Sequence, residues 1–384
     1  MTPPTTTQVR SGTEIRPRSG ATQDRAETSP AMDARPPAPA VTIVVLNWNG
    51  GDDTLACLDS LHAVAGDRVK VMVVDNGSTD GSVSAIRAAH PEVELLETGR
   101  NLGYAGGNNV GIERAVASGA DFVLVLNNDT TCAPDVVARL LDAAARHPRA
   151  GLFSPRMLYM DDPQRVWFDG ARWKPDALTF GFPGKDRTEA ELGTEDHETD
   201  YACGAALFVR AEVVRQIGAF DERFFLVWEE ADWCYRAREA GWSSMVVPSA
   251  RIWHRVGASF GSEASPLRTY FSARNRLVWI SRHGRIAERA AALLSALRAL
   301  IPRWVTSGDP GAALPKRMVW GTRDWLLSAV GRGERLTYLA KRQGLLDYLR
   351  GRLGPTPLCV LDLNQRWQAK RRGPTPVSAR SADH

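Results

Sequence analysis

Four short segments in which apolar residues dominate constrain what the first half of this chain can fold into. They span residues 41–46, 69–74, 93–96 and 122–126. Each run is followed by a polar turn, and most of these turns lead into a segment with the apolar spacing of a helix. A continuous apolar run with many β-branched residues, such as 41–46, is typical of a strand that is covered on both faces. Because such strands alternate with helices at short spacing, we expect parallel βαβ units and an α/β fold.

Polar turns follow the predicted strands at their carboxyl ends. These turns lie at residues 47–51, 75–82, 101–109 and 127–129. Open α/β sheets bind their ligands at this edge, so four converging turns predict a binding cleft there. We expect the third turn to be a loop, with a helix running from about residue 109 to residue 118 after it.

The turn at 127–129 has the sequence Asn-Asn-Asp, which offers hard oxygen ligands to a divalent cation. Mg²⁺ in such sites takes one or two carboxylates, and diphosphate oxygens and water complete its shell. A turn that bonds its own backbone is the alternative. At the end of the second predicted strand, Asp75 can accept hydrogen bonds from the ribose or base of a nucleoside. Residues 78–82 can instead act as caps and turn formers.

Residues 103–107 include three glycines. Glycine lets the backbone approach a phosphate or a sugar closely. The stretch fits neither the G-x-G-x-x-G pattern nor the Walker A pattern, which disfavours a dinucleotide-dependent enzyme and a P-loop ATPase.

Three carboxylates lie within four residues, at Glu229, Glu230 and Asp232, and aromatic residues flank them on both sides. Like charges this close repel, so one of them is expected to have a raised pKa and to exchange a proton near neutral pH. The alternative is the acidic first turn of a helix at 230–240, where carboxylates suit the helix dipole. Trp228 and Trp233 can stack on a sugar or form a dry wall, although core packing is the commoner role.

Other segments are assigned from their composition. Residues 1–40 have few large apolar side chains and are predicted to be a disordered tail. A hairpin at 165–173 and a mobile loop up to residue 200 are expected next. Buried strands are predicted at 201–209 and 244–247.

A helical apolar stripe runs along residues 286–301, with arginines nearby at positions 282, 285, 289 and 298. Such a helix can lie on an anionic membrane surface, as a peripheral contact. It can also pack against the main domain or a second subunit, so a homo-oligomer stays open. Residues 367–384 are predicted to be a flexible basic tail.

The composition excludes several classes of protein. The formal net charge is +4, so no nucleic-acid partner is expected. The five cysteines are scattered and form no CxxC pair, which argues against a disulfide framework or a zinc knot and fits a reducing compartment. We find no signal peptide and no apolar run long enough to span a bilayer, so we expect a cytoplasmic location.

Together these segments resemble the bacterial family 2 glycosyltransferases of the GT-A fold, in their rhamnosyltransferase-like branch. The resemblance is carried by Val-Val-Leu-Asn-Trp-Asn-Gly at 44–50, Val-Val-Asp-Asn-Gly-Ser-Thr-Asp-Gly-Ser at 73–82, Asn-Leu-Gly-Tyr-Ala-Gly-Gly-Asn-Asn at 101–109, Leu-Asn-Asn-Asp at 126–129, Gly-Ala at 204–205, Phe-Asp-Glu-Arg-Phe-Phe at 220–225, Glu-Glu-Ala-Asp at 229–232 and His254. It covers residues 41–280. It implies a Rossmann-like nucleotide-diphospho-sugar transferase domain with a mixed sheet flanked by helices, and a helical C-terminal extension at 281–366.

The resemblance implies inverting transfer of a sugar from a nucleotide-sugar donor, such as dTDP-rhamnose or a UDP-hexose, to a hydroxyl of a cell-surface glycan or lipid-linked acceptor. Glu230 stands at the position of the catalytic base, with Glu229 and Asp232 beside it. Asp129 and His254 stand where family members bind Mg²⁺ or Mn²⁺. The positions matched to donor binding are Asn47, Asn49, Asp75, Asn76, Asn101, Gly106, Asn108 and Asn128, and those matched to acceptor binding are Gly204, Trp228 and Trp233.

Two positions depart from the family's pattern, and two other functions stay open. The D-x-D motif has become Asn-Asn-Asp at 127–129, and the base position holds Glu where many relatives have Asp. A sugar-nucleotide pyrophosphorylase needs a glycine-rich loop with Lys or Arg after the first strand, where this chain has Asp52 and Asp53. A non-catalytic glycan- or nucleotide-binding module would carry the acids as structural remnants.

Overall fold

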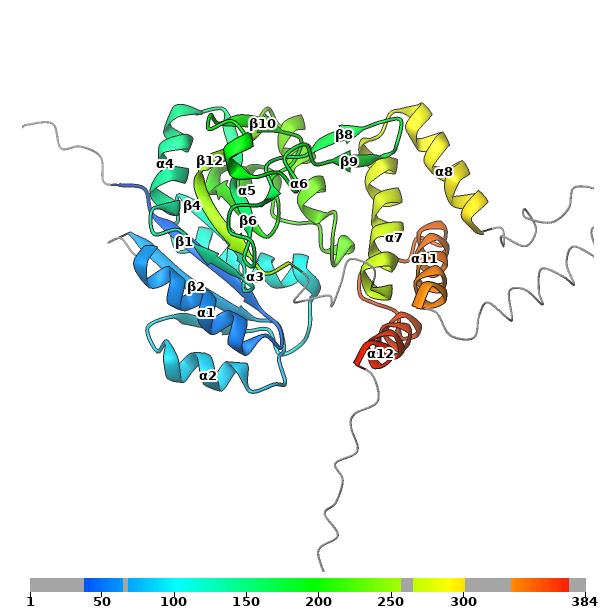
Figure 1. Cartoon of the computed structure of the whole chain (residues 1–384), viewed down its shortest axis with the longest axis horizontal. Coiled ribbons are helices and arrows are strands. Elements are labelled where there is room, and N and C mark those ends of the chain that lie inside the picture. The colour runs from blue at the N-terminus through cyan, green and yellow to red at the C-terminus, as the bar shows by residue number, and fades with distance from the viewer. Residues whose placement is uncertain (1–37, 65–67, 257–264, 301–332, 373–384) are drawn as a thin grey trace, which may run out of the picture. The chain divides into compact units, whose positions relative to one another are not determined.

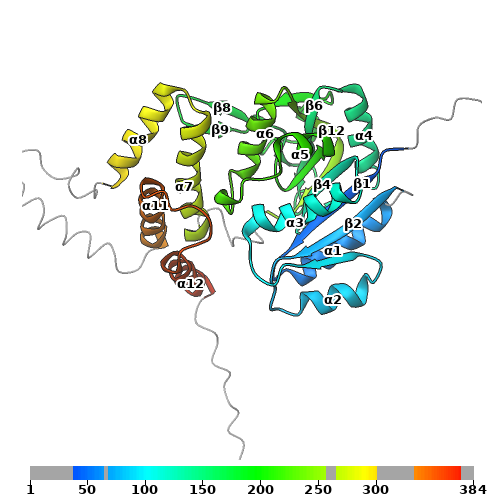
Figure 2. The same cartoon turned by 180° about the vertical axis from the view of Figure 1, so that it is seen from behind.

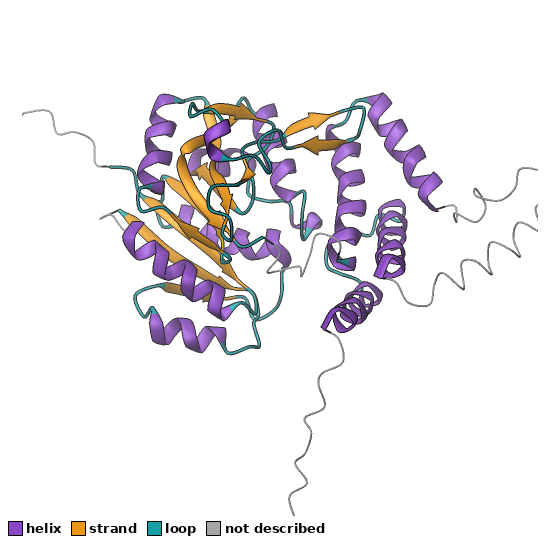
Figure 3. Ribbon diagram, in the orientation of Figure 1, coloured by secondary structure: helices purple, strands orange, loops and turns teal. Residues whose placement is uncertain are grey.

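The structure is a computed structural model that describes residues 38–64, 68–256, 265–300 and 333–372. The predicted disordered tail at 1–40 therefore lies almost entirely outside the described residues. From residue 39 onward, the described chain forms a sheet with helices packed on it, and further helices follow near the C-terminus (Figures 1 and 3).

A mixed sheet organises the α/β part of the chain. One half consists of four parallel strands: β1 (Val41–Asn47), β2 (Val69–Asp75), β3 (Glu94–Glu97) and β4 (Phe122–Asn127). Each strand agrees with its predicted range to within one residue at either end. Nearly every residue of β1 and β4 is buried, because helices cover both faces of the sheet.

The sheet continues beyond β4 with strands of both directions. These strands are β6 (Ala150–Tyr159), β10 (His197–Thr199), β11 (Ala206–Arg210) and β12 (Ser243–His254), and the order across the sheet is β10-β12-β6-β11-β4-β1-β2-β3. β11 runs antiparallel to β4 and β6, whereas β12 runs parallel to β6. Two short strands join them: β5 (Thr130–Cys132) pairs with β12, and β7 (Val166–Phe168) pairs with β6.

Helices cover both faces of the parallel half (Figures 1 and 2). The helices of the α/β part are α1 (Gly51–Leu61), α2 (Ser82–Ala89), α3 (Gly103–Ala117), α4 (Val136–Arg146), α5 (Ala211–Ile217) and α6 (Glu229–Glu239). Successive side chains of β1 point to opposite faces of the sheet, so this strand contacts α3 on one face and α1 on the other. Leu46 packs against Gly107 of α3, whereas the next residue, Asn47, accepts a hydrogen bond from Thr54 of α1.

Helix α3 begins at Gly103, well before residue 109, so the prediction of a glycine-rich loop was wrong. The glycines serve close packing. Gly103 has a φ of 78°, and a Cβ there would lie 2.5 Å from the carbonyl oxygen of Phe225. A Cβ at Gly107 would lie 2.6 Å from Cδ1 of Leu46. Only glycine lets α3 approach both neighbours this closely.

The segment between β7 and β11 also differs from the prediction. The hairpin is formed by β8 (Arg172–Lys174) and β9 (Thr179–Gly181), because β7 pairs with β6 instead. The segment predicted to be a mobile loop contains β9, a 3₁₀ turn at Glu189–Glu191 and β10. Its Asp, Pro and Gly residues form turns between very short strands, and composition does not distinguish such turns from one long loop.

Strands β11 and β12 differ in extent from the predicted strands. β11 begins at Ala206, and residues 201–205 lead into it without strand pairing. β12 is much longer than predicted, because it passes through a register shift between Val247 and Arg251 and continues to His254. Such an irregularity accommodates a proline, which has no N–H to donate, and Pro248 lies within it.

Four helices follow β12 in the described residues: α7 (Pro266–His283), α8 (Ile286–Leu300), α11 (Gly333–Leu349) and α12 (Leu358–Arg372). The hydroxyl of Tyr270 on α7 donates to Asp347 of α11 at 2.9 Å. α8 coincides with the predicted apolar stripe, and α12 extends into the first residues of the predicted basic tail. None of the helices described is both long enough and apolar enough to cross a bilayer.

Candidate active site

One hollow brings together the two predicted metal ligands, two of the three predicted catalytic acids and one residue matched to acceptor binding. Asp129, Glu229, Glu230, His254 and Gly204 all line it. Glu229 and Glu230 belong to the first turn of α6. Asp129 lies two residues after the end of β4, and His254 is the last residue of β12. Residues far apart in the sequence therefore face one cleft beyond the carboxyl end of β4, where an open α/β sheet binds its ligands.

Asp129 and His254 meet although 125 positions separate them. The pairing of β5 with β12 places His254 opposite Thr130, the residue after Asp129. Nε2 of His254 lies 3.1 Å from Oδ1 of Asp129, and both side chains are buried. Trp167 packs against the imidazole, with the ring centroids 4.4 Å apart.

This pair fits a divalent cation. Two ligands at right angles, each about 2.1 Å from an octahedral ion, are about 3 Å apart, which is close to the observed separation. A carboxylate suits Mg²⁺ or Mn²⁺, and only two protein ligands leave the remaining positions for substrate oxygens and water. The other ring nitrogen of His254, Nδ1, is buried and has no hydrogen-bond partner among the described residues, but it does not face Asp129 in this pair.

Glu229 and Glu230 form the start of α6. Burial raises the pKa of both carboxyl groups, and repulsion from Glu230 raises the pKa of Glu229 further. A hydrogen bond between the two side chains also raises the pKa of Glu229, whereas it lowers that of Glu230. Glu229 therefore holds its proton more firmly, and Glu230 is the more easily ionised member of the pair. The expectation of a raised pKa in this cluster is confirmed.

The loop before α6 is strained and is held by α7. Phe225, Val227 and Trp228 have backbone φ values of 62°, 59° and 78°, which residues other than glycine rarely adopt. Nδ2 of Asn275 lies 2.8–2.9 Å from three carbonyl oxygens of residues 224–227. Nε of Arg274 donates to Oδ1 of Asn275 at 2.9 Å, which orients the amide toward those carbonyls.

Asp232, the third acid of the cluster, does not line the hollow. Its carboxylate lies 2.8 Å from Arg236, 3.1 Å from Arg282 and 2.9 Å from His283. Burial opposes its ionisation, but hydrogen bonds from His283 and Arg236 prevail and lower its pKa below the ordinary value. Asp232 joins α6 to α7 through these contacts, which support a structural role for it; its predicted place beside the catalytic base stays a prediction.

Asp75 and Asn47 form a buried pair at the ends of β2 and β1. Nδ2 of Asn47 donates to Oδ1 of Asp75 at 2.8 Å, and the amides of Gly77 and Ser78 donate to the other carboxylate oxygen. Asn49 is exposed and hydrogen-bonds the same turn. These predicted nucleoside contacts form one network, which does not extend to the hollow that contains Asp129.

The other predicted donor residues support the turns around the cleft. Asn76 and Asn101 hydrogen-bond the first turn of α3, and Asn128 hydrogen-bonds the first turn of α1. Gly106 and Asn108 lie within α3, and Oδ1 of Asn108 is buried without a partner among the described residues. None of these five residues lines the hollow that contains Asp129.

The three residues matched to acceptor binding separate in the structure. Gly204 lines the hollow that contains Asp129. Trp228 lines a second hollow, which shares Glu230 with the first. Trp233 is fully buried, and its Nε1 donates to the carbonyl oxygen of Gly218 at 2.8 Å, so core packing accounts for it.

Cations that sequence reasoning missed line both hollows. Lys185 and Arg268 line the first hollow, and Arg268, Arg276 and Lys341 line the second. Lys185 lies in the turn-rich segment between β9 and β10, and the others lie on helices that are rich in basic residues. No local pattern distinguishes them from solvent-facing cations, because their position depends on how α7 and α11 pack.

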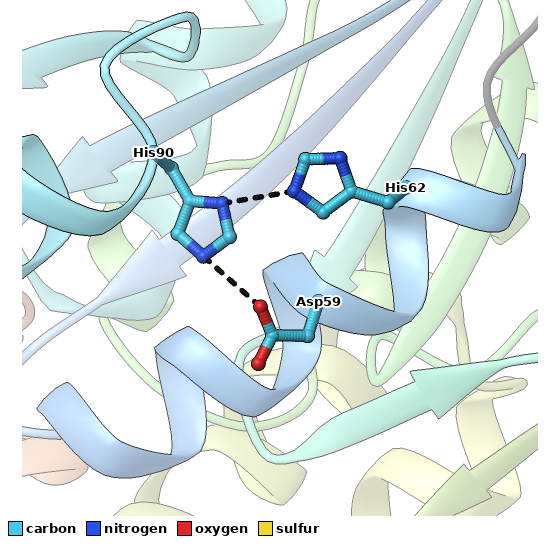
Figure 4. Close-up of side chains that lie close together, drawn as sticks. All are labelled: Asp59, His62 and His90. Carbon is cyan, nitrogen blue, oxygen red and sulfur yellow. Dashed lines mark hydrogen bonds and ion pairs between the residues drawn. The ribbon is translucent and has the colours of Figure 1, made fainter.

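A separate cluster of potential metal ligands consists of Asp59, His62 and His90 (Figure 4). Nε2 of His62 lies 3.3 Å from Nδ1 of His90, and Nε2 of His90 lies 3.4 Å from Oδ1 of Asp59. The cluster lies at the C-terminal ends of α1 and α2, and none of its members lines either hollow. A cation bound there would not contact a substrate beside Asp129.

Comparisons with known proteins identify the family. The family model described as Glycosyl transferase family 2 matches residues 42–218. The chain is 34% identical over 241 residues to N-acetylglucosaminyl-diphospho-decaprenol L-rhamnosyltransferase of Mycobacterium tuberculosis, an alignment that covers 58% of this chain and 78% of the relative. The chain belongs to glycosyl transferase family 2. Its similarity to this relative places it in the rhamnosyltransferase-like branch.

A second relative of this family 2 glycosyltransferase is galactofuranosyltransferase GlfT1 of Mycolicibacterium smegmatis, which is 30% identical over 69% of this chain and 87% of its own. Among solved structures, the crystal structure of GalNAc-T7 with UDP, GalNAc and Mn²⁺ has a TM-score of 0.51 and 15% identity, over 76% of this chain and 56% of that chain. The glycosyltransferase described here has the predicted GT-A fold.

Proposed function

We propose that this enzyme is an inverting glycosyltransferase that moves a sugar from a nucleotide-diphosphate donor to a hydroxyl of a cell-surface glycan or lipid-linked acceptor, with Glu230 as general base. The observation that carries the proposal is that Glu230 lines both hollows, whereas Glu229 lines only the one that contains Asp129. A general base must reach the acceptor hydroxyl while the donor sugar lies beside it. The junction of two hollows meets this requirement.

The order of the two pKa values supports the same residue. When the pair holds one proton, that proton resides mainly on Glu229, and Glu230 is the carboxylate. The raised pKa of Glu230 also makes its carboxylate a stronger base than an exposed one. Glu229 then acts as the neutral neighbour that donates a hydrogen bond to the base.

In the proposed reaction, the acceptor oxygen attacks the anomeric carbon from the face opposite the diphosphate. A carbon–oxygen bond to the acceptor forms as the bond to the nucleoside diphosphate breaks, and the leaving group takes the electron pair. Glu230 takes the proton of the hydroxyl. Because attack and departure occur on opposite faces, the anomeric configuration inverts. Holding donor and acceptor in line supplies much of the acceleration.

We assign the donor diphosphate to the first hollow, beside Asp129 and His254. A bound Mg²⁺ or Mn²⁺ ion would neutralise the charge that grows on the departing diphosphate. Lys185 and Arg268 line the same hollow and add positive charge. The network of Asp75 and Asn47 is the proposed nucleoside end of the cleft.

The names of the relatives indicate which substrates to test first. The M. tuberculosis relative is named as an L-rhamnosyltransferase of N-acetylglucosaminyl-diphospho-decaprenol, and the M. smegmatis relative as a galactofuranosyltransferase. We therefore propose dTDP-rhamnose as the first donor and a UDP-hexose as the second. A lipid-linked acceptor is proposed on the same basis.

An acceptor of this kind lies at a membrane, and α8 suits a peripheral contact with its inner, cytoplasmic face. The exposed fractions along α8 are 85% for Ile286, 41% for Leu293, 48% for Leu294 and 45% for Leu297. Exposed arginines stand on or beside this helix at positions 285, 289 and 298. Exposed apolar residues combined with arginines favour adsorption to an anionic bilayer.

Glu230→Gln tests the proposed function. We expect kcat for sugar transfer to fall by about 10²–10⁴-fold, because the amide cannot accept the proton. Binding of the nucleotide sugar, measured by thermal shift with Mn²⁺ present, is expected to persist. Glu239→Gln, the same change at the exposed end of α6, is the matched control.

Unchanged transfer by Glu230→Gln would remove the catalytic role of this residue. A nucleotide-sugar screen with and without Mg²⁺ or Mn²⁺ tests the broader assignment. If no donor is bound or turned over under any condition, the transferase function is wrong for this chain.

A further inference from the structure

The second hollow carries an excess of positive charge beside the proposed base. Glu230 is the one carboxylate among the described residues that line it, whereas Arg268, Arg276 and Lys341 line it as well. We propose that this hollow binds a phosphate or diphosphate on the acceptor sugar, so that the acceptor is a sugar diphosphate. This inference rests on the proposed function of the first hollow.

One face of α7 supplies the hydrogen-bond donors. Thr269, Ser272 and Arg276 lie three and four residues apart, so they share a face of the helix, and all three line the hollow. Lys341 reaches the hollow from α11, which runs beside α7 (Figures 1 and 2). Hydroxyl groups donate single hydrogen bonds to phosphate oxygens, and a guanidinium can contact two oxygens at once.

The environment of Arg276 favours a bound anion. Burial lowers the pKa of Arg276, and no charged side chain in the described part of the chain offsets that shift. Arg276 is half-buried, and a guanidinium that is partly withdrawn from water without a counter-charge costs free energy. Arg274, two residues earlier on the same helix, is satisfied by backbone carbonyls and the Asn275 amide. A bound anion can therefore still supply a counter-charge to Arg276, whereas Arg274 already has its hydrogen-bond partners.

The aromatic side chains of the second hollow indicate how the acceptor would be oriented in it. Phe182, Tyr201 and Trp228 line the second hollow, and Glu230 lies where it meets the first. Aromatic faces pack well against sugar rings. A sugar held there has its attacking hydroxyl at Glu230, and a phosphate on the same sugar comes within reach of α7 and α11. The M. tuberculosis relative is named for an acceptor of this chemistry.

The experiment measures transfer to three forms of one sugar, N-acetylglucosamine. They are a short-chain prenyl diphosphate, the uridine diphosphate and the uncharged methyl glycoside. We expect wild type to prefer the prenyl diphosphate over the methyl glycoside in kcat/KM. The variant with both Arg276→Ala and Lys341→Ala is expected to reduce this preference at least about tenfold, mainly through KM.

Two further variants separate charge from packing. Arg342→Ala, an exposed neighbour on α11 that does not line the hollow, is expected to leave the preference unchanged. Arg276→Lys keeps the charge and is expected to keep most of the preference. Equal losses in Arg276→Lys and Arg276→Ala would point to packing and would overturn the inference.

The remaining outcomes are distinct. Equal use of the uridine diphosphate and the prenyl diphosphate would support the phosphate site and show that the lipid is not recognised. No preference over the methyl glycoside in wild type, or an unchanged preference in the double variant, would overturn the inference and leave the proposed function intact. No turnover of any donor, by transfer or by hydrolysis, would count against the proposed function instead.

Discussion

Asn275 donates to the carbonyl oxygen of Val227 at 2.8 Å, and this bond fastens α7 to the strained loop before α6. Val227 has a φ of 59°, a conformation that a β-branched residue avoids. Strain of this kind persists only when the surrounding structure enforces it. The placement of Glu229 and Glu230 therefore depends on a helix that contributes neither of them.

Asn275→Ala should loosen this loop. We expect the free energy of unfolding to fall by about 1–3 kcal/mol, because buried carbonyl groups lose their donor. We expect kcat to fall at least about tenfold, since a base displaced by a fraction of a bond length transfers protons poorly. Urea unfolding and steady-state kinetics measure the two effects. Ser281→Ala, on the same helix, removes only a bond to the carbonyl of Val278 and serves as control. Full kcat in Asn275→Ala would show that the strained loop does not position the base.

Glu229→Gln should change how stability depends on pH. Burial raises the pKa of Glu229 well above 4.5, so the folded protein keeps a proton that the unfolded chain releases. The stability from this proton is complete below about pH 4.5 and is lost as pH rises through the folded pKa. A neutral amide has no such loss, so the variant should gain stability relative to wild type as pH increases. Thermal unfolding over about pH 4 to 9 tests this. Parallel curves for the two proteins would contradict it.

His254→Ala should weaken the metal dependence of transfer. We expect the Mn²⁺ concentration for half-maximal donor turnover to rise at least about tenfold, because one of the two proposed protein ligands is lost. Titration of Mn²⁺ into the transfer assay provides the measurement. His62→Ala, from the cluster at the ends of α1 and α2, should leave the titration unchanged. A larger shift in His62→Ala than in His254→Ala would place the functional ion at Asp59, His62 and His90, and would contradict a metal site at Asp129 and His254.

Leu294→Glu combined with Leu297→Glu should weaken the contact of α8 with lipid. We expect binding to vesicles that contain anionic lipid to fall about tenfold, because buried apolar area is lost and negative charge is added. Vesicle cosedimentation at two salt concentrations is the measurement. Leu358→Glu combined with Leu361→Glu adds the same two charges at exposed leucines of α12 and serves as control. Equal losses in both proteins would indicate an effect of net charge alone.

The parallel half of the sheet could be predicted because its signal is local. β1 and β4 are short apolar runs with a polar turn directly after each, and burial on both faces removes the need for alternation. β2 and β3 contain charged residues, and no residue of β3 is fully buried, so their signal is weaker. The acidic start of α6 was also visible, and its raised pKa follows from crowded carboxylates that leave water.

Features that depend on contacts between distant segments were not predictable in this way. The link between Asp129 and His254 requires a register shift in β12, and sequence alone suggested it only through a family resemblance. The early start of α3 depends on the space that Leu46 and Phe225 leave for glycine. Asn275 looks like an ordinary polar residue of a helix until the loop it holds is folded against it.

Arg274 also donates to the carbonyl oxygen of Gly354 at 2.9 Å, and the amide of Gly354 donates to the carbonyl of Arg223. Gly354 belongs to the short link between α11 and α12. The link between α11 and α12 therefore helps to hold the segment before α6, although it lies far along the chain from Glu229 and Glu230. If Glu230 is the base as proposed, we expect a protease cut or an inserted residue in this link to impair sugar transfer, so truncation before α12 is expected to reach the candidate site.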